Sequence, residues 1–357
     1  MPAIRKATIG DVARHAGVTK GTVSLAYSGK RPVAEETRQR IFEAAEELQW
    51  TASHRARALA TSRTGAIGLV VARDPEVLAT DAFFAKFISG CERVLAEHDM
   101  GLMLHAVTSP EAEQAVYERL AAGRADGVIL LDVQVEDPRF ALVQRLDLPA
   151  VVLSAHEPTA GETAGLPTVY SDDSPAVTEL VAHMTQAGHT RIAHVAGPHH
   201  YIHARIRREA FAAAMRERGL DDSLVVEGDF TAASGRDATA HLLDLAEPPT
   251  AILYANDMMA IAGLSLARSR GLRVPEDLSI SGYDDSELSA HLSPALTTVS
   301  TGAVQRGELA VTALLATLAG EEPGIVLADH TTVVPRGSIA APPGAPARTP
   351  ASTRTAP

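Results

Sequence analysis

The spacing of apolar positions changes twice along the chain. In residues 1–50 apolar residues recur every three or four positions, which is the period of a helix. Residues 51–64, TASHRARALATSRT, are polar, basic and rich in alanine, without an apolar stripe. From residue 65 to about 340, short apolar runs alternate with helical patterns. The pattern predicts a helical head, a linker and a large α/β body.

Three helices joined by short turns are expected in the head, over residues 9–16, 20–27 and 35–49. Thr8 and Thr19 can cap the first two, because a threonine oxygen accepts a hydrogen bond from a free backbone N–H of the first turn. Gly17 is a natural stop for the first helix. Ala34 lacks a hydroxyl before the third helix, at a cost of about 1 kcal/mol.

The body is expected to contain parallel sheets covered by helices on both faces, since strands and helices alternate along it. Expected strands include 66–71, 102–106, 127–131, 150–153, 192–195, 251–255 and 278–283. Expected helices include 82–97, 174–187, 205–217 and 258–269. About 275 residues of this pattern exceed what one sheet usually holds, so we expect two lobes. The tail 341–357, rich in proline, alanine and threonine, is expected to be disordered.

Charge divides the chain in the same way. Of 32 Lys and Arg and 44 Asp and Glu, residues 1–64 hold 11 basic and 6 acidic, which leaves 21 basic and 38 acidic for the rest. A basic head on an acidic body suggests that only the head contacts phosphate. The single cysteine, Cys91, fits a reducing cytoplasm, and no apolar stretch approaches the length of a membrane span or a secretory signal.

The spacing of three head residues predicts a helix-turn-helix. Such a unit needs a small residue where its helices cross, a glycine-like turn, and an apolar residue that fixes the second helix; Ala13, Gly17 and Val23 meet these needs. The second helix then enters the major groove with its N-terminal residues at base edges. Predicted DNA-contacting residues in the head are Thr8, Lys20, Gly21, Thr22, Ser24, Leu25 and Tyr27. A small three-helix bundle with an unrelated role is the structural alternative.

The string ATIGDVARHAGVTKGTVSLAYSGKRPVAEETRQRIFEAAEELQW strongly resembles the lactose-repressor/galactose-repressor (LacI/GalR) family, and the resemblance continues to about residue 340. It implies a two-lobed, periplasmic-binding-protein-like body after the head. It also implies that residues 51–64 form a hinge helix on operator DNA, with Leu59 wedged into the minor groove and Arg57 beside it. The sequence departs from the family at Ala52-Ser53 and at His54-Arg55.

A ligand site is expected at the carboxyl ends of the parallel strands, where open sheets bind their ligands. Asp74, Asn256 and Asp284 follow such strands. The resemblance adds Phe83, Phe84, Tyr201, His203, Arg207 and Phe230 as effector-binding residues. Asp284 could instead cap a helix, the phenylalanines could be core, and Arg207 could form a surface ion pair. Ser154 stands where the family has an acidic residue.

The sequence thus predicts an allosteric transcriptional regulator, most simply a repressor, that binds operator double-stranded DNA as a homodimer in the cytoplasm. A small effector, such as a sugar, is expected between the lobes. The run His199-His200-x-x-His203 has no cysteine nearby and favours a polar cleft lining over zinc. No cofactor, metal, membrane contact or enzyme motif is predicted. A sugar-binding transport protein and a sugar-processing enzyme with a DNA-binding domain are the alternatives.

Overall fold

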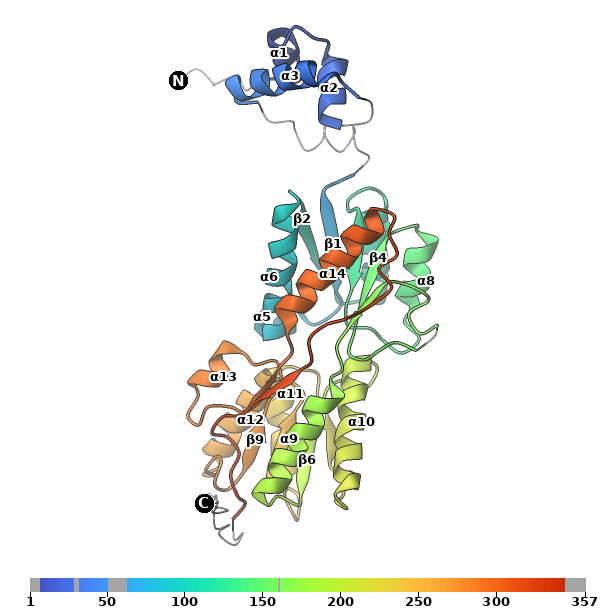
Figure 1. The fold of residues 1–357 in the computed structure, drawn as a ribbon. Helices are drawn as coiled ribbons and strands as arrows, with labels where there is room; N and C mark the ends of the chain where they lie inside the picture. Colours follow the sequence, from blue (N-terminus) through green and yellow to red (C-terminus); the bar gives the residue numbers. More distant parts are fainter. Residues whose placement is uncertain (1–6, 29–31, 51–62, 160, 344–357) are drawn as a thin grey trace, which may run out of the picture.

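The fold is taken from a computed structural model, which describes residues 7–28, 32–50, 63–159 and 161–343 (Figure 1). A small helical head precedes an elongated body of two lobes, stacked one beyond the other. The predicted hinge with Arg57 and Leu59, and all of the predicted tail except residues 341–343, lie outside the described residues.

The head contains the three predicted helices, α1 (Ile9–His15), α2 (Lys20–Ser28) and α3 (Glu35–Glu47). Thr8 caps α1 with the help of Asp11, whose carboxylate accepts from the Thr8 backbone N–H at 2.9 Å. The Thr19 hydroxyl accepts from the backbone N–H of Thr22 at 3.1 Å and so caps α2. Val12, Val23 and Ile41, one from each helix, are fully buried and form the centre of the core. A cluster this small leaves the head sensitive to each of them.

The first lobe is built on a six-stranded parallel sheet with the order β11-β5-β4-β3-β1-β2. Its strands are β1 (Ala66–Val71), β2 (Gly101–Ala106), β3 (Gly127–Leu130), β4 (Ala150–Ser154), β5 (Thr168–Tyr170) and β11 (Ile325–Leu327). Helices α5 (Pro75–Thr80), α6 (Ala82–Glu97), α7 (Pro110–Ala121), α8 (Pro138–Arg145) and α14 (Ala303–Leu318) surround it. Side chains alternate along β1, so Leu69 packs with α6 and α14 while Val70 packs with α7 and α8.

The second lobe has a four-stranded parallel sheet with the order β7-β6-β8-β9. Its strands are β6 (Ile192–Ala196), β7 (Val225–Glu227), β8 (Ala251–Tyr254) and β9 (Ser279–Ser281). Helices α9 (Ser174–Ala187) and α10 (Ile202–Glu217) share a core with one face, and α11 (Ala232–Leu243) and α12 (Asp257–Ser269) with the other. The short helix α13 (Glu287–His291) and an antiparallel pair, β10 (Thr298–Ser300) and β12 (Thr332–Val334), complete it.

The chain passes between the lobes three times, after β5, after β10 and after β11. The second passage leads into α14, which packs closely against α6. Gly90 of α6 lies at this crossing, and a Cβ there would stand 1.9 Å from the backbone oxygen of Val304. The three passages therefore bring segments that are far apart in sequence to the boundary between the lobes.

The predicted two-lobed α/β fold with parallel sheets is confirmed. Three predicted strands are too long, 127–131 and 251–255 by one residue each. Residues 278–283 reduce to β9, because the chain leaves the sheet and Asp284 and Asp285 take left-handed backbone conformations, with φ of 95° and 48°.

Candidate functional site

The exposed side of α2 is the candidate DNA surface of the head. Lys20 and Gly21 are exposed at its start, and Thr22, Ser24 and Leu25 are half-buried. No acidic residue occurs in α2, so its exposed side offers no carboxylate to repel phosphate.

Two of the predicted DNA contacts also have structural roles. The Thr8 hydroxyl donates to Asp11 at 2.7 Å as part of the α1 cap. The Tyr27 ring packs edge-on against Phe42 and Trp50, with centroid distances of 5.0 and 5.3 Å. Tyr27 therefore holds the end of α2 against α3 and against Trp50, which follows α3 in the chain.

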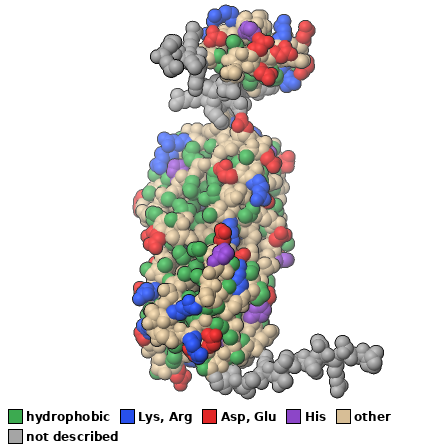
Figure 2. All heavy atoms as spheres, turned by 90° about the vertical axis from the view of Figure 1, so that its left-hand side faces the viewer, with side chains coloured by type: hydrophobic (Ala, Val, Ile, Leu, Met, Phe, Trp, Pro, Cys, Tyr) green, Lys and Arg blue, Asp and Glu red, His purple; other side chains and the backbone are tan. Residues whose placement is uncertain are grey.

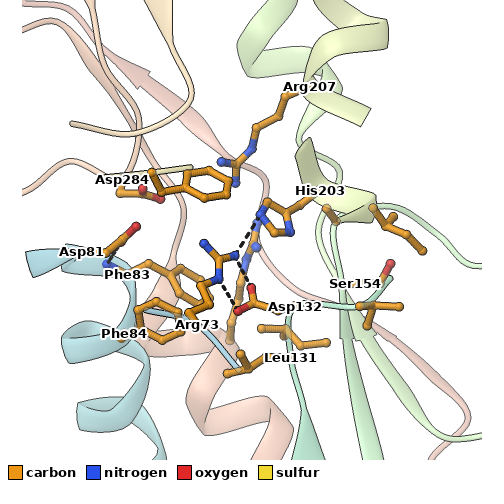
Figure 3. Close-up of a pocket in the computed structure, with 16 residues that line it drawn as sticks. Arg73, Asp81, Phe83, Phe84, Leu131, Asp132, Ser154, His203, Arg207 and Asp284 are labelled. Carbon is orange, nitrogen blue, oxygen red and sulfur yellow. Dashed lines mark hydrogen bonds and ion pairs between the residues drawn. The ribbon is translucent and has the colours of Figure 1, made fainter. Parts of the chain in front are cut away.

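A cavity lies between the two lobes at the carboxyl ends of their strands (Figure 3). Its empty space, the open mouth included, is about 600 Å³. Six predicted effector-binding residues line it: Phe83, Phe84, His203, Arg207, Phe230 and Asp284. Ser154, at the end of β4, lines it too. Aromatic faces, carboxylates and guanidinium groups thus converge from both lobes.

Asp74 is not among the lining residues, contrary to the sequence expectation. It is exposed and caps α5, where its carboxylate accepts from the Glu76 backbone N–H at 2.8 Å. The turn after β1 directs its neighbour Arg73 into the cavity instead.

Asn256 and Tyr201 lie outside the lining, although both were expected to contact the effector. The Asn256 amide donates to Asp81 Oδ2 at 3.2 Å and to the Phe230 carbonyl at 2.9 Å, and its oxygen caps α12. Its polar atoms therefore hold the cavity wall, including the left-handed backbone of Phe230 (φ 71°). Tyr201 is buried behind Arg73, whose guanidinium carbon is 4.5 Å from the tyrosine ring centroid.

Sequence reasoning missed four charged residues that line the cavity: Arg73, Asp81, Asp132 and Arg306. Arg73 and Asp132 form a two-pronged ion pair with two hydrogen bonds of 2.6 Å, and both side chains are largely buried. Both residues follow strands of the first lobe, β1 and β3, so their position after a strand is a signal present in the sequence. Arg306 carried no such signal, because it lies inside α14.

Asp173 joins three segments directly behind the cavity. Its carboxylate is fully buried, and it accepts from Arg207 Nε at 2.8 Å and from Arg306 Nη2 at 3.0 Å. Arg207 belongs to α10 of the second lobe, Arg306 to α14, and Asp173 to the passage between β5 and α9. This Asp173 hub therefore links the cavity to two of the three passages between the lobes.

The electrostatics of the cavity favour neutral forms of two groups. Burial, followed by the charge of Asp81, raises the pKa of the Asp284 carboxyl well above its ordinary value. Burial, followed by the charge of Arg73, lowers the pKa of His203 well below its ordinary value. Lys86 donates to the Asp284 carbonyl at 3.1 Å and so supports its left-handed backbone.

The raised pKa of Asp284 makes stability depend on pH. Folding favours the protonated form of the Asp284 carboxyl. Its contribution to the free energy of unfolding is therefore full below about pH 4, and it is lost as the pH rises through the pKa of the folded state. We expect Asp284→Asn to raise the melting temperature at pH 8, with the gain shrinking as the pH falls towards 4. Asp285→Asn is the control: it removes the negative charge that pairs with Arg336 and should lower stability. A gain for Asp284→Asn that is equal at both pH values would contradict this explanation.

The described residues contain no group of three or more His, Cys, Asp or Glu side chains that could hold a metal ion. His199, from the histidine run, is exposed and bonds Glu227 at 3.1 Å, whereas His203 lines the cavity. Within the described ranges, no helix is long and apolar enough to cross a membrane.

A helix-turn-helix head joined to a two-lobed body with a cavity between its lobes defines a ligand-responsive DNA-binding regulator. Residues 8–53 match the family described as bacterial regulatory proteins, lacI family, and residues 181–339 match the periplasmic binding protein-like domain. The transcriptional regulator CelR of Thermobifida fusca is 32% identical over 92% of this chain and 98% of its own. The chain belongs to the LacI family of bacterial transcriptional regulators.

Two solved structures of relatives are similar over nearly the whole chain. A CelR–cellobiose complex has a TM-score of 0.72 at 29% identity, covering 93% of this chain and 99% of the other. The lac repressor dimer bound to operator and the anti-inducer ONPF has a TM-score of 0.80 at 27% identity, with coverages of 94% and 100%. These relatives are transcriptional regulators and not enzymes.

Proposed function

We propose that this regulator is a repressor whose affinity for operator DNA is set by a neutral sugar bound between its lobes. The observation that carries the proposal is the cavity, where the faces of Phe83 and Phe230 accompany the carboxyl of Asp284 and the guanidinium of Arg207. Rings can stack on the apolar face of a sugar, while carboxyl and guanidinium groups bond its hydroxyls. The relatives solved with cellobiose and with ONPF support a ligand of this kind.

The Asp173 hub offers a route from the sugar to the DNA. A sugar that accepts hydrogen bonds from Arg207 and Arg306 changes the bonds of these two residues with Asp173. The angle between the lobes then changes as well. That change would alter the spacing of the two hinge segments and thereby the fit of the two heads to one operator. Coupling of this kind is typically about 1–3 kcal/mol.

The proposed repressor acts as a homodimer in the cytoplasm, without catalytic activity. Figure 2 shows hydrophobic side chains gathered on the face of the first lobe that carries β2 and α6. Leu104 of β2 and Leu288 of α13 are both exposed, at 41% and 62%. A gathering of apolar side chains like that on the first lobe favours contact with a second copy, as does the dimeric lac repressor.

Lys20→Ala tests the DNA contact of the head. Lys20 is exposed at the start of α2, where it can reach a guanine edge in the major groove. We expect operator affinity to fall by roughly 1–3 kcal/mol, with relaxed sequence choice at one position per half-site. A gel-shift titration on operator variants measures both. Glu43→Ala, exposed on α3, is the control. Unchanged affinity and base preference for Lys20→Ala would refute the contact.

Asp284→Ala tests the effector site. We expect it to abolish release of operator by cellobiose or another effective neutral sugar, because it removes a buried acceptor of the cavity. Binding to DNA without sugar should persist. Asp285→Ala is the control, since Asp285 pairs with Arg336 outside the cavity lining. If Asp284→Ala releases the operator at the same sugar concentration as the wild type, this carboxyl does not bind the effector.

A further inference from the structure

Arg73 occupies the centre of the cavity and reaches from one lobe to the other (Figure 3). It follows β1 of the first lobe, but its guanidinium carbon lies 4.5 Å from the ring centroid of Tyr201 and 4.5 Å from that of Phe230, both in the second lobe. Its Nη2 is also 3.3 Å from His203 Nε2. The guanidinium therefore lies on the aromatic surface of the opposite lobe.

This position conflicts with stacking of a sugar on Phe230. The tip of the Phe230 ring is packed against Gly197, where an added Cβ would stand 2.1 Å from Cζ. Arg73 lies over the ring itself, at the distance of a cation–π contact. A sugar ring cannot use the face that Arg73 covers unless the guanidinium withdraws.

Withdrawal of Arg73 changes the charge of the cavity. Asp132 would lose both of its 2.6 Å bonds and become a largely buried carboxylate without its partner. Asp81 lines the same cavity, while Arg207 and Arg306 already share the carboxylate of Asp173. The remaining lining then has an excess of carboxylate, which accepts hydrogen bonds from hydroxyls and repels an anionic ligand.

We propose that Arg73 is a specificity-determining residue that competes with the effector for the face of Phe230. Only a neutral polyhydroxylated ligand, whose adjacent hydroxyls replace the guanidinium against Asp132, displaces it. Sugar acids and sugar phosphates are excluded by Asp81 and Asp132. This inference rests on the proposed function, since it assumes that a sugar binds in this cavity.

The test is calorimetric titration of the full-length protein with cellobiose, D-glucose, D-ribose and D-glucuronate. Arg73→Ala should bind at least one neutral sugar tenfold or more tighter than wild type and gain nothing for glucuronate. Adding methylguanidinium should reverse the gain, because it can refill the place between Tyr201, Phe230 and Asp132. Arg139→Ala is the matched control: Arg139 is equally buried and ion-paired, with Asp137, but does not line the cavity.

The proposal is overturned if no neutral sugar binds Arg73→Ala more tightly than wild type, or if methylguanidinium leaves the gain unchanged. Should Arg73→Ala fail to fold, the double variant Arg73→Ala/Asp132→Asn removes both charges together. The double variant should bind neutral sugars more tightly than wild type, and methylguanidinium should no longer reduce this affinity. Sugar binding equal to or weaker than that of wild type would again overturn the proposal. Release of operator is measured separately. A sugar gain without DNA release would refute the proposed function and leave this inference standing.

Discussion

Ile41→Ala is expected to abolish operator binding while leaving the body folded. Ile41 is fully buried where the three helices of the head meet, with Val12 and Val23. Truncating a buried isoleucine costs about 2–5 kcal/mol. A domain as small as the head has little more stability than that. Its helices would therefore unfold at ordinary temperature, and α2 would no longer be presented to the major groove.

The body supplies the internal reference for this experiment. Two thermal transitions are expected in the wild type, and only the one belonging to the body should remain in Ile41→Ala, with sugar binding unchanged. Glu43→Ala, on the exposed side of the same helix, controls for helix propensity and should retain operator binding. Normal operator affinity in Ile41→Ala would show that the head core is larger or more adaptable than these contacts indicate.

Asp173→Ala is expected to lower the free energy of unfolding of the body by about 3–5 kcal/mol, the usual cost of breaking a buried ion pair by removing one partner. Asp173 is fully buried and is shared by Arg207 and Arg306, so its loss leaves two buried cations short of a partner. We expect the remaining folded protein to bind DNA without responding to sugar, because the hub connects the cavity to the passages between the lobes.

Asp172→Ala is the matched control for the hub. Asp172 is the preceding residue, half-buried, and its carboxylate accepts from the Ser174 backbone N–H at 2.9 Å. Losing this local bond should cost only about 1 kcal/mol and leave the sugar response intact. Urea unfolding curves and sugar-dependent gel shifts distinguish the two variants. Equal losses of stability would mean that the ion pairs of Asp173 contribute no more than a local cap.

Local chemistry is what the sequence by itself determined. The caps at Thr8 and Thr19, the glycine at 17 and the apolar positions at 13 and 23 are close in sequence, so helix geometry and the short turn between α1 and α2 bring them together. The alternation of strands and helices likewise predicted two lobes with parallel sheets. The ends of strands then indicated where a ligand site lies, because parallel strands end at one edge.

Only the tertiary structure decided which side chains form that site. Asp74 and Arg73 are neighbours after β1, and the backbone turn there sends Arg73 into the cavity and leaves Asp74 as a helix cap. Asn256 follows a strand as expected, yet its amide is used by Asp81 and by the Phe230 carbonyl. These outcomes depend on contacts between residues far apart in the chain, which no local pattern records.

The Asp173 hub illustrates the same limit most clearly. Arg306 is 133 residues from Asp173 and lies in the first turn of α14, where an arginine ordinarily faces solvent. Its burial follows from the return of α14 to the first lobe, a topology that the spacing of apolar residues does not specify. The sequence determined many of the helices and strands and the sheet edge at which a ligand would bind. The crossing of the lobes decided which charges meet there, because a buried charge is stable only where a distant segment supplies its partner.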